Sequence, residues 1–468
     1  MILDTGTAYK TVFCLSLFWI GLSWYWSRLI SSLESYTLAN RKLGLSLSTA
    51  SILATWITSS TMMLAPQLTY EMGMWGLFSY LIFAAGLFAF APLAKRIKVL
   101  IPDGNTCGDF FRIRYGKRAW NIFLPITIFY SLTWLVSMAM AGGLLLETLS
   151  GIPYTQGVSI ILLLCVTYTL RGGLYAVVGT DAIQSVLLLL GIAIIGVFAL
   201  ERISVSDVYA RVIEVKPELM NIFLPSAIIA FINTFLFGVG EIFHGNIWWS
   251  RVFAMKAGNE SKAFVLAGLL WLPVPVITGY LAFLAFPLGI ELPRTDVVGP
   301  LVAAELVGET GVVVVFIVVF CSLVSSTDSL LASTADLISH DILRSRINCS
   351  EKQALQLTKL CIVFLGVTTC IVTLPKVGTL ATVLFFAGPL VGSTIAPIIY
   401  GLFSKRARSK DACLALVLGS VSGLMSYFFI AWTTGAITSV VVSTLCMHIS
   451  SKTSQTNFSW QLANKELV

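Results

Sequence analysis

The 468-residue chain has very little charge for its length. Only 11% of its residues are Asp, Glu, Lys or Arg and 57% are hydrophobic, whereas an average soluble domain has about 25% charged and about 45–50% apolar residues. So few charged side chains cannot cover the surface of a soluble protein of this size, which excludes a soluble multidomain protein. The composition indicates a polytopic membrane protein.

Histidine and paired cysteines are also scarce. The chain has three His, and its nine Cys stand mostly alone inside apolar runs with no CxxC pair, which is typical of buried free thiols and not of a zinc site or a disulfide framework. HExxH, GxSxG and P-loop motifs are absent from the sequence, and no nucleophile–base pair stands out. We therefore predict that the protein is not an enzyme, needs no cofactor and does not drive transport with ATP.

Long apolar runs fill most of the chain, and each has a length that crosses a bilayer, about 17–25 residues. The first run continues to about residue 27 without a cleavage site, so it predicts a membrane helix and not a cleaved signal peptide. We place thirteen transmembrane helices near 11–28, 46–70, 74–94, 119–146, 157–171, 177–200, 221–247, 264–287, 311–341, 357–375, 378–403, 411–430 and 433–449. Because this number is odd, the two termini lie on opposite sides of the membrane.

Basic residues are distributed unequally between the two sides. Twenty-four of the 30 Lys and Arg, Arg251 among them, fall on one side of these helices and six on the other. The positive-inside rule therefore places the protein in the plasma or inner membrane with its N-terminus outside and its C-terminus in the cytoplasm. The basic excess indicates contact with anionic lipid headgroups and not with nucleic acid. Two acidic segments, 201–220 and 288–310, are predicted as solvated outer loops.

Two spans carry more polar and helix-weakening residues than lipid contact requires. They lie five spans apart and so run in opposite directions, which is the pattern of inverted five-helix repeats whose first helices are broken at the membrane midplane. Ordinary Gly and Pro kinks are the alternative. The residues concerned are Thr58, Ser59, Ser60, Thr61 and Pro66 in the second span, and Gly238, Gly240, Glu241, His244 and Gly245 in the seventh.

The ninth span has a stripe of hydroxyl groups beside a carboxylate. At about 100° per residue, five serines share one arc of about 100°, with Asp328 about 60° to its side; they are Ser322, Ser325, Ser326, Ser329 and Ser333. These groups are costly against lipid, and oxygen ligands of this kind replace the water around a cation such as Na⁺. Close helix packing at small residues is the alternative, but it does not explain Asp328.

A second deep carboxylate, Asp181, lies about one turn inside the sixth span. Its position near the cytoplasmic start of that helix is compatible with a helix cap. Its depth in the membrane also allows a role in ion binding, although spacing alone slightly favours the cap. Both interpretations stay open.

Three segments resemble motifs of the sodium:solute symporter family, which includes sodium-coupled proline, pantothenate, sialic acid and glucose carriers. GGLYAVVGTDAIQ (172–184) is similar to the family's GG-x-x-A-V-x-x-T-D-x-x-Q stretch, SSTDSLLASTADLISHDI (325–342) to its ion-site helix, and NTCGDFFRIRYG (105–116) to a cytoplasmic loop. The likeness runs from about residue 36 to 450. The 105–116 loop and the Trp249–Arg251 stretch also resemble the urea and polyamine permease branch.

The resemblance implies an all-α polytopic fold with the inverted repeats of the bacterial leucine transporter. Each repeat would begin with a broken helix. The implied organisation is an extra N-terminal helix and loop (1–45), a first repeat (46–220), a second repeat (221–403), two C-terminal helices (404–449) and a cytoplasmic tail (450–468).

The resemblance also implies where ions bind. The family's sodium site falls on the backbone carbonyls of Ala54, Ile57 and Ser322 and on the hydroxyls of Ser325 and Ser326. A second ion or a proton, bound in some members, would use Asp181, Asp328 and Ser329. This chain has Asp328 where a Ser can stand, and two neighbouring carboxylates can hold Na⁺ more strongly or share a proton, which leaves the coupling ion and its stoichiometry open.

For the solute, the resemblance implies a cavity lined or gated by Thr61, Ser79, Tyr80 and Glu241. Glu241 replaces an aromatic residue, and a carboxylate in a broken helix would suit an amine or a cationic solute. A water-facing Glu at a helix end is the alternative. The class of solute therefore stays open among amino acids, carboxylates, urea, amines and sugars.

The predicted function is sodium-coupled symport that imports a small organic solute by alternating access. The predicted partners are that solute, Na⁺ and membrane lipid, and nothing in the sequence calls for an obligatory protein partner. The alternatives are a proton-coupled symporter of the same fold, a passive channel for a small solute such as urea, and a transporter-like sensor, which would need a separate signalling domain.

Overall fold

The computed structural model describes residues 3–453 and 458–460, and within them the regular structure is helical apart from one isolated β-bridge between Leu43 and Met255. Most of the predicted tail, 450–468, therefore lies outside the described residues. Among the described residues, ten helical stretches are long and apolar enough to cross a membrane. The prediction of a multi-pass helical membrane protein is confirmed at this level.

The first part of the chain crosses the molecule repeatedly in long helices. Its helices are α1 (Thr5–Ser27), α2 (Leu33–Leu38), α3 (Leu45–Trp56), α4 (Ser59–Met72), α5 (Met74–Leu81), α6 (Ala84–Leu100), α7 (Cys107–Ser150), α8 (Tyr154–Arg202) and α9 (Val205–Val215). The second part contains α10 (Pro225–His244), α11 (Asn246–Ala254), α12 (Glu260–Trp271), α13 (Pro273–Leu288), α14 (Val298–Leu337), α15 (Glu351–Thr373), α16 (Leu380–Phe385), α17 (Gly388–Phe403), α18 (Ser409–Phe429) and α19 (Gly435–Thr453).

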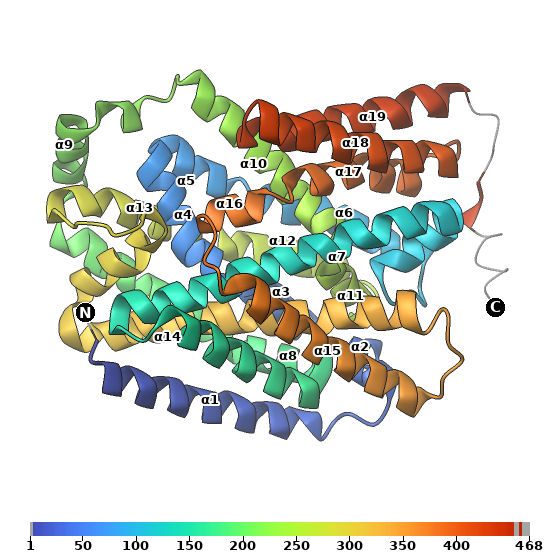
Figure 1. Cartoon of the computed structure of the whole chain (residues 1–468), viewed down its shortest axis with the longest axis horizontal. Coiled ribbons are helices and arrows are strands. Elements are labelled where there is room, and N and C mark those ends of the chain that lie inside the picture. The colour runs from blue at the N-terminus through green and yellow to red at the C-terminus, as the bar shows by residue number, and fades with distance from the viewer. Residues whose placement is uncertain (1–2, 454–457, 461–468) are drawn as a thin grey trace.

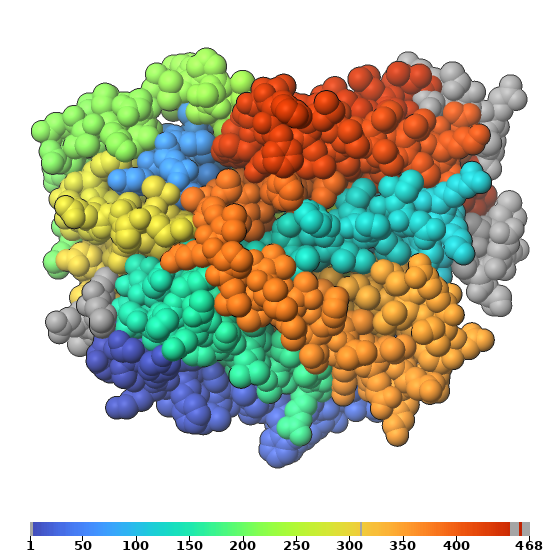
Figure 2. All heavy atoms as spheres, in the orientation of Figure 1, coloured from blue at the N-terminus to red at the C-terminus, as the bar shows by residue number. Residues whose placement is uncertain are grey.

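Helix α14 runs through the middle of the bundle (Figure 1), where it packs against α3, α4, α7, α8, α11, α13 and α15. In the same view α1 begins at the left of the molecule and α19 ends at the right. Helices α7, α8, α15, α18 and α19 cover much of the face shown in Figure 2. The serine stripe of the ninth span therefore lies in the interior of the protein and not at its lipid-facing surface.

Two helices are interrupted at the positions that their sequences predict. Helix α3 ends at Trp56 and α4 begins at Ser59, with Thr58 and Thr61 capping α4 reciprocally through their side chains and backbone N–H groups. Helix α10 ends at His244, and α11 begins after the extended backbone of Gly245. An interruption leaves backbone groups without helical partners, and this makes both positions candidates for binding.

The predicted fifth and sixth spans are joined by a kink and not by a loop. Helix α8 runs from Tyr154 to Arg202 and bends at Gly173, whose φ of 47° and ψ of −149° lie outside the helical region. A Cβ at this position would stand 2.4 Å from the carbonyl oxygen of Tyr36. Only glycine combines this backbone conformation with so close a neighbour.

The two acidic segments that are predicted as outer loops are more ordered than predicted. Within 201–220 the chain forms α9, which buries Val208 and Val212, and within 288–310 it begins α14 at Val298, with a kink at Gly308. The prediction of loops was wrong there, whereas most residues of 201–220 are exposed, as predicted. The acidic residues of an amphipathic helix lie on its exposed side, and a few apolar residues on the other side are enough to pack it against the protein.

Candidate ion and solute site

The stripe of serines on α14 is buried, as its spacing predicts for a face turned towards other helices. Each of its five hydroxyl side chains is at most 6% exposed, and Asp181 and Asp328 are fully buried. Helices α3, α8 and α11 bring further polar groups to the same region. The interior of the bundle thus contains a polar cluster, which in a membrane protein marks a functional site.

The predicted ion site joins the end of α3 to α14. The hydroxyl of Ser326 lies 3.1 Å from the carbonyl oxygen of Thr55 and 3.0 Å from that of Ser322. The N–H of Thr58 turns away to the side-chain oxygen of Thr61, at 3.2 Å. Among the described residues, the carbonyl oxygens of Ala54 and Ile57 consequently accept no hydrogen bond.

Ser325 connects the ion site to the first of the two carboxylates. Its hydroxyl donates to Oδ1 of Asp181 at 2.6 Å, and the hydroxyl of Ser51 donates to Oδ2 at 2.7 Å. Asp181 therefore faces side chains of α3 and α14, and its interpretation as a helix cap is wrong. It holds these two helices to α8.

Arg251 of α11 is the residue of this cluster that sequence reasoning missed. The sequence places it among the basic residues of the predicted inner segments, but in the structure it is only 1% exposed. Its Nη2 lies 2.6 Å from Oγ1 of Thr55, 2.7 Å from Oγ of Ser329 and 3.5 Å from Oδ2 of Asp181. An Arg inside the apolar stretch NIWWSRVFA was the available signal, because a buried guanidinium needs a carboxylate partner.

Asp328 has a different environment from Asp181. The hydroxyl of Tyr168 donates to one of its oxygens, while Oδ1 is buried without a hydrogen-bond partner in the described part of the chain. Ser329, predicted to act beside it, instead accepts from Arg251 and lies 3.2 Å from Oγ1 of Thr55. A carboxylate with a free buried oxygen can hold a proton or contribute to a cation site.

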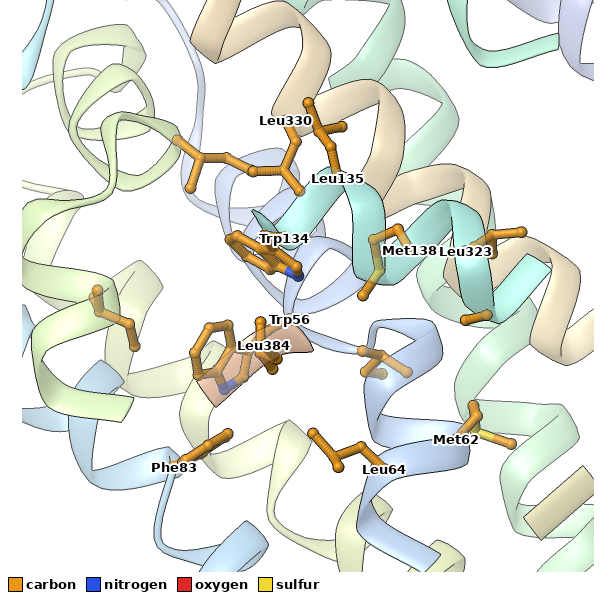
Figure 3. Close-up of a cluster of buried hydrophobic side chains, with 14 of the residues drawn as sticks. Trp56, Met62, Leu64, Phe83, Trp134, Leu135, Met138, Leu323, Leu330 and Leu384 are labelled. Atoms are coloured by element: carbon orange, nitrogen blue, oxygen red, sulfur yellow. The ribbon is translucent and has the colours of Figure 1, made fainter. Parts of the chain in front are cut away.

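A small cavity lies next to the α3–α4 interruption, and we call it the solute cavity. Its volume is about 10 Å³, and Figure 3 shows Trp56, Phe83, Trp134 and Leu384, four of its lining residues, on separate segments of the chain. The lining residues are Trp56, Thr58, Ser60, Tyr80, Phe83, Trp134, Glu241, Trp271 and Leu384.

Two of the four residues predicted to bind the solute line the solute cavity, and two do not. Tyr80 and Glu241 line the solute cavity. Thr61 lies behind Tyr80, with 3.4 Å between the two hydroxyls, and Ser79 is buried outside the lining. Glu241 is only 3% exposed, so the interpretation of a water-facing glutamate is wrong.

Two of the motifs that carry the family resemblance pack against each other at one end of the bundle. Thr106, which caps α7, donates to Asp341 at 2.7 Å, and the indole of Trp120 donates to the other oxygen of Asp341 at 2.8 Å. Nε2 of His340 lies 3.1 Å from Oδ1 of Asp109. This network holds the 105–116 segment to the end of the ion-site helix, so both motifs serve one junction.

A bundle of membrane-length helices with a buried polar site at interrupted helices defines a membrane transport protein. The chain belongs to the sodium:solute symporter family, whose family model matches residues 36–419.

Known proteins resemble the chain over most of its length. The osmoregulated proline transporter OpuE of Bacillus subtilis is 23% identical over 420 residues, covering 86% of this chain and 85% of that protein. The urea-proton symporter DUR3 of Oryza sativa is 24% identical over 464 residues, covering 89% of this chain and 64% of that protein. The chain thus spans about three fifths of the length of the urea transporters it matches.

A solved structure of a Na⁺-coupled sialic acid symporter, in a substrate-bound outward-open state, has the same fold. It superposes with a TM-score of 0.82 at 17% identity, covering 96% of this chain and 98% of that one.

Proposed function

We propose that the protein is a sodium-coupled symporter that carries a small organic solute across the membrane by alternating access. The observation that carries this proposal is at the end of α3, where the carbonyl oxygens of Ala54 and Ile57 have no hydrogen-bond partner among the described residues and the neighbouring carbonyl of Thr55 accepts from the hydroxyl of Ser326. Carbonyl and hydroxyl oxygens suit a hard cation that has lost its water.

The same interruption would couple the ion to the solute. The carbonyls of Ala54 and Ile57 belong to the end of α3, while Trp56 and Thr58 line the solute cavity. A cation held between α3 and α14 would keep these helices together and fix the walls of the cavity. Its departure would let them separate, which is how a shared structural element links two binding equilibria.

We further propose that residues 46–220 and 221–403 are inverted repeats and that the chain has thirteen spans. The interruptions of α3–α4 and α10–α11, the kink of α8 at Gly173 and the membrane-length helices support this division. The N-terminus would lie outside and the C-terminus in the cytoplasm. Single cysteines placed in 201–220 and in 405–410 should react with an impermeant maleimide from outside and from inside, respectively; the reverse pattern would contradict the orientation.

Proton-coupled uptake of a urea-like solute is the second candidate. It is favoured by the buried carboxyl group of Glu241 in the solute cavity and by the similarity to a urea-proton symporter. It is also favoured by Oδ1 of Asp328, which has no hydrogen-bond partner within the described part of the chain. A carboxyl group that is protonated on one side of the membrane and released on the other can couple transport to H⁺.

Uptake of labelled solutes into proteoliposomes tests both candidates. The panel spans proline, lactate, glucose, urea and putrescine, with an inward Na⁺ gradient, an inward H⁺ gradient or neither. Accumulation with Na⁺ alone supports the proposed function, and accumulation with H⁺ alone supports the second candidate. Equilibration without accumulation would identify a passive channel, and binding without movement a sensor.

A further inference from the structure

The solute cavity has aromatic walls. Five rings from separate parts of the chain line it, with centroid distances of 6.3 Å for Trp56 and Phe83 and 5.9 Å for Tyr80 and Trp271. In Figure 3 Trp56 lies between Trp134 and Phe83. The face of an aromatic ring is electronegative and attracts a cation within about 6 Å of its centre.

Glu241 is the only acidic residue of the cavity lining. The residue is only 3% exposed, and no salt bridge of the described residues reaches its carboxyl group. Its polar neighbour is the hydroxyl of Tyr130. A buried carboxylate without a cationic partner is costly, and Glu241 is part of the cavity lining.

The nearby histidine does not supply the missing charge. His244, one turn along α10, places Nδ1 2.7 Å from the carbonyl oxygen of Gly240, and its ring packs against Tyr130 at 4.6 Å. Its Nε2 is buried without a partner in the described part of the chain. An imidazole that donates one hydrogen bond and leaves the other nitrogen in an apolar site is stable as the neutral form.

We propose that the solute cavity recognises a small organic cation, with its ammonium group against the aromatic faces and its charge neutralised by Glu241. This inference rests on the proposed function, which it completes with a class of solute. The cavity volume of about 10 Å³ is close to the room that one water molecule needs, so the walls must separate for a solute to enter. A neutral solute would leave the carboxylate without a counter-charge.

Binding to the purified full-length protein tests this proposal directly. Quenching of tryptophan fluorescence is titrated with choline and with its uncharged isostere 3,3-dimethylbutan-1-ol, and then with ethanolamine, putrescine, urea and proline. We expect at least one cation to bind, and choline to bind about tenfold or more tightly than its isostere. Equal binding of the charged and neutral members of the pair, or binding of urea or proline but of no cation, would overturn the proposal.

Variants assign the recognition to Glu241. Glu241→Gln should lower cation affinity about tenfold or more and remove the preference over the neutral isostere, while Glu241→Asp should keep part of it. Glu218→Gln, in an exposed segment away from the cavity, is the matched control and should bind like wild type. Two variants of Trp134 give an independent test of the aromatic wall. Trp134→Leu should weaken cation binding, whereas Trp134→Phe should retain it. The two variants should unfold at similar temperatures.

Uptake separates failure of this inference from failure of the proposed function. If Na⁺ drives accumulation of a neutral solute equally well in wild type and Glu241→Gln, the symport proposal stands and the organic-cation proposal is wrong. If a cation binds in a Glu241-dependent manner but no solute accumulates in a Na⁺ gradient, the recognition stands and the coupling proposal is wrong.

Discussion

Arg251 offers the sharpest test of the packing that we describe. Its guanidinium donates to Ser51, Thr55, Ser329 and the carbonyl oxygen of Ile247, at distances between 2.6 and 3.1 Å. It also forms the buried ion pair with Asp181. Replacing it by methionine keeps much of the apolar stem and removes every one of these contacts.

The expected cost is large because both partners are buried. Removing one member of a buried ion pair typically costs about 3–5 kcal/mol, since the other charge is left without compensation. A hydrogen bond to a charged group contributes about 1.5–3 kcal/mol, but contributions within one network do not add. We therefore expect Arg251→Met to lose about 3–5 kcal/mol of unfolding free energy.

The assay is unfolding of the purified protein in detergent, followed by tryptophan fluorescence. Arg211→Met is the matched control, because Arg211 pairs with Glu214 at the surface, where both side chains are well exposed, and such pairs contribute about 0–1 kcal/mol. Asp181→Asn combined with Arg251→Met should be more stable than Arg251→Met alone. A loss below about 1 kcal/mol in Arg251→Met, or no recovery in the double variant, would refute the reasoning.

Three further predictions concern the ion site and the α8 kink. Ser326→Ala should raise the Na⁺ concentration for half-maximal uptake about tenfold or more, whereas Ser322→Ala should change it little, because that hydroxyl donates within its own helix at 2.8 Å; equal effects would contradict the assignment. Exchanging Na⁺ for K⁺ should lower the unfolding temperature of the wild-type protein but not that of Ser326→Ala. The same shift in both proteins would show that Na⁺ binds at a site without Ser326. Gly173→Ala should destabilise by at least about 1–3 kcal/mol, while Gly21→Ala, with open space around it, should be neutral or stabilising; a stable Gly173→Ala would show that the bend is not enforced.

Properties that depend on local sequence could be read without the structure. The membrane spans follow from runs of apolar residues, and the buried stripe on α14 follows from serines repeated at helical spacing. The interruption of α3–α4 follows from Thr58 and Thr61, whose side chains cap a new helix start. Each of these features depends on residues within a few turns of one another, so periodicity and capping chemistry suffice to predict them.

Tertiary structure alone decided which buried groups meet. The sequence is compatible with Arg251 as an inner-loop cation and Asp181 as a helix cap, yet the two residues, 70 positions apart in the chain, form a buried pair. The sequence is compatible with Glu241 at a water-facing helix end, whereas in the structure Glu241 lines a cavity with aromatic walls. Burial and charge pairing depend on how α3, α8, α11 and α14 pack, and hydropathy and helical period, which are local quantities, carry no information about that packing.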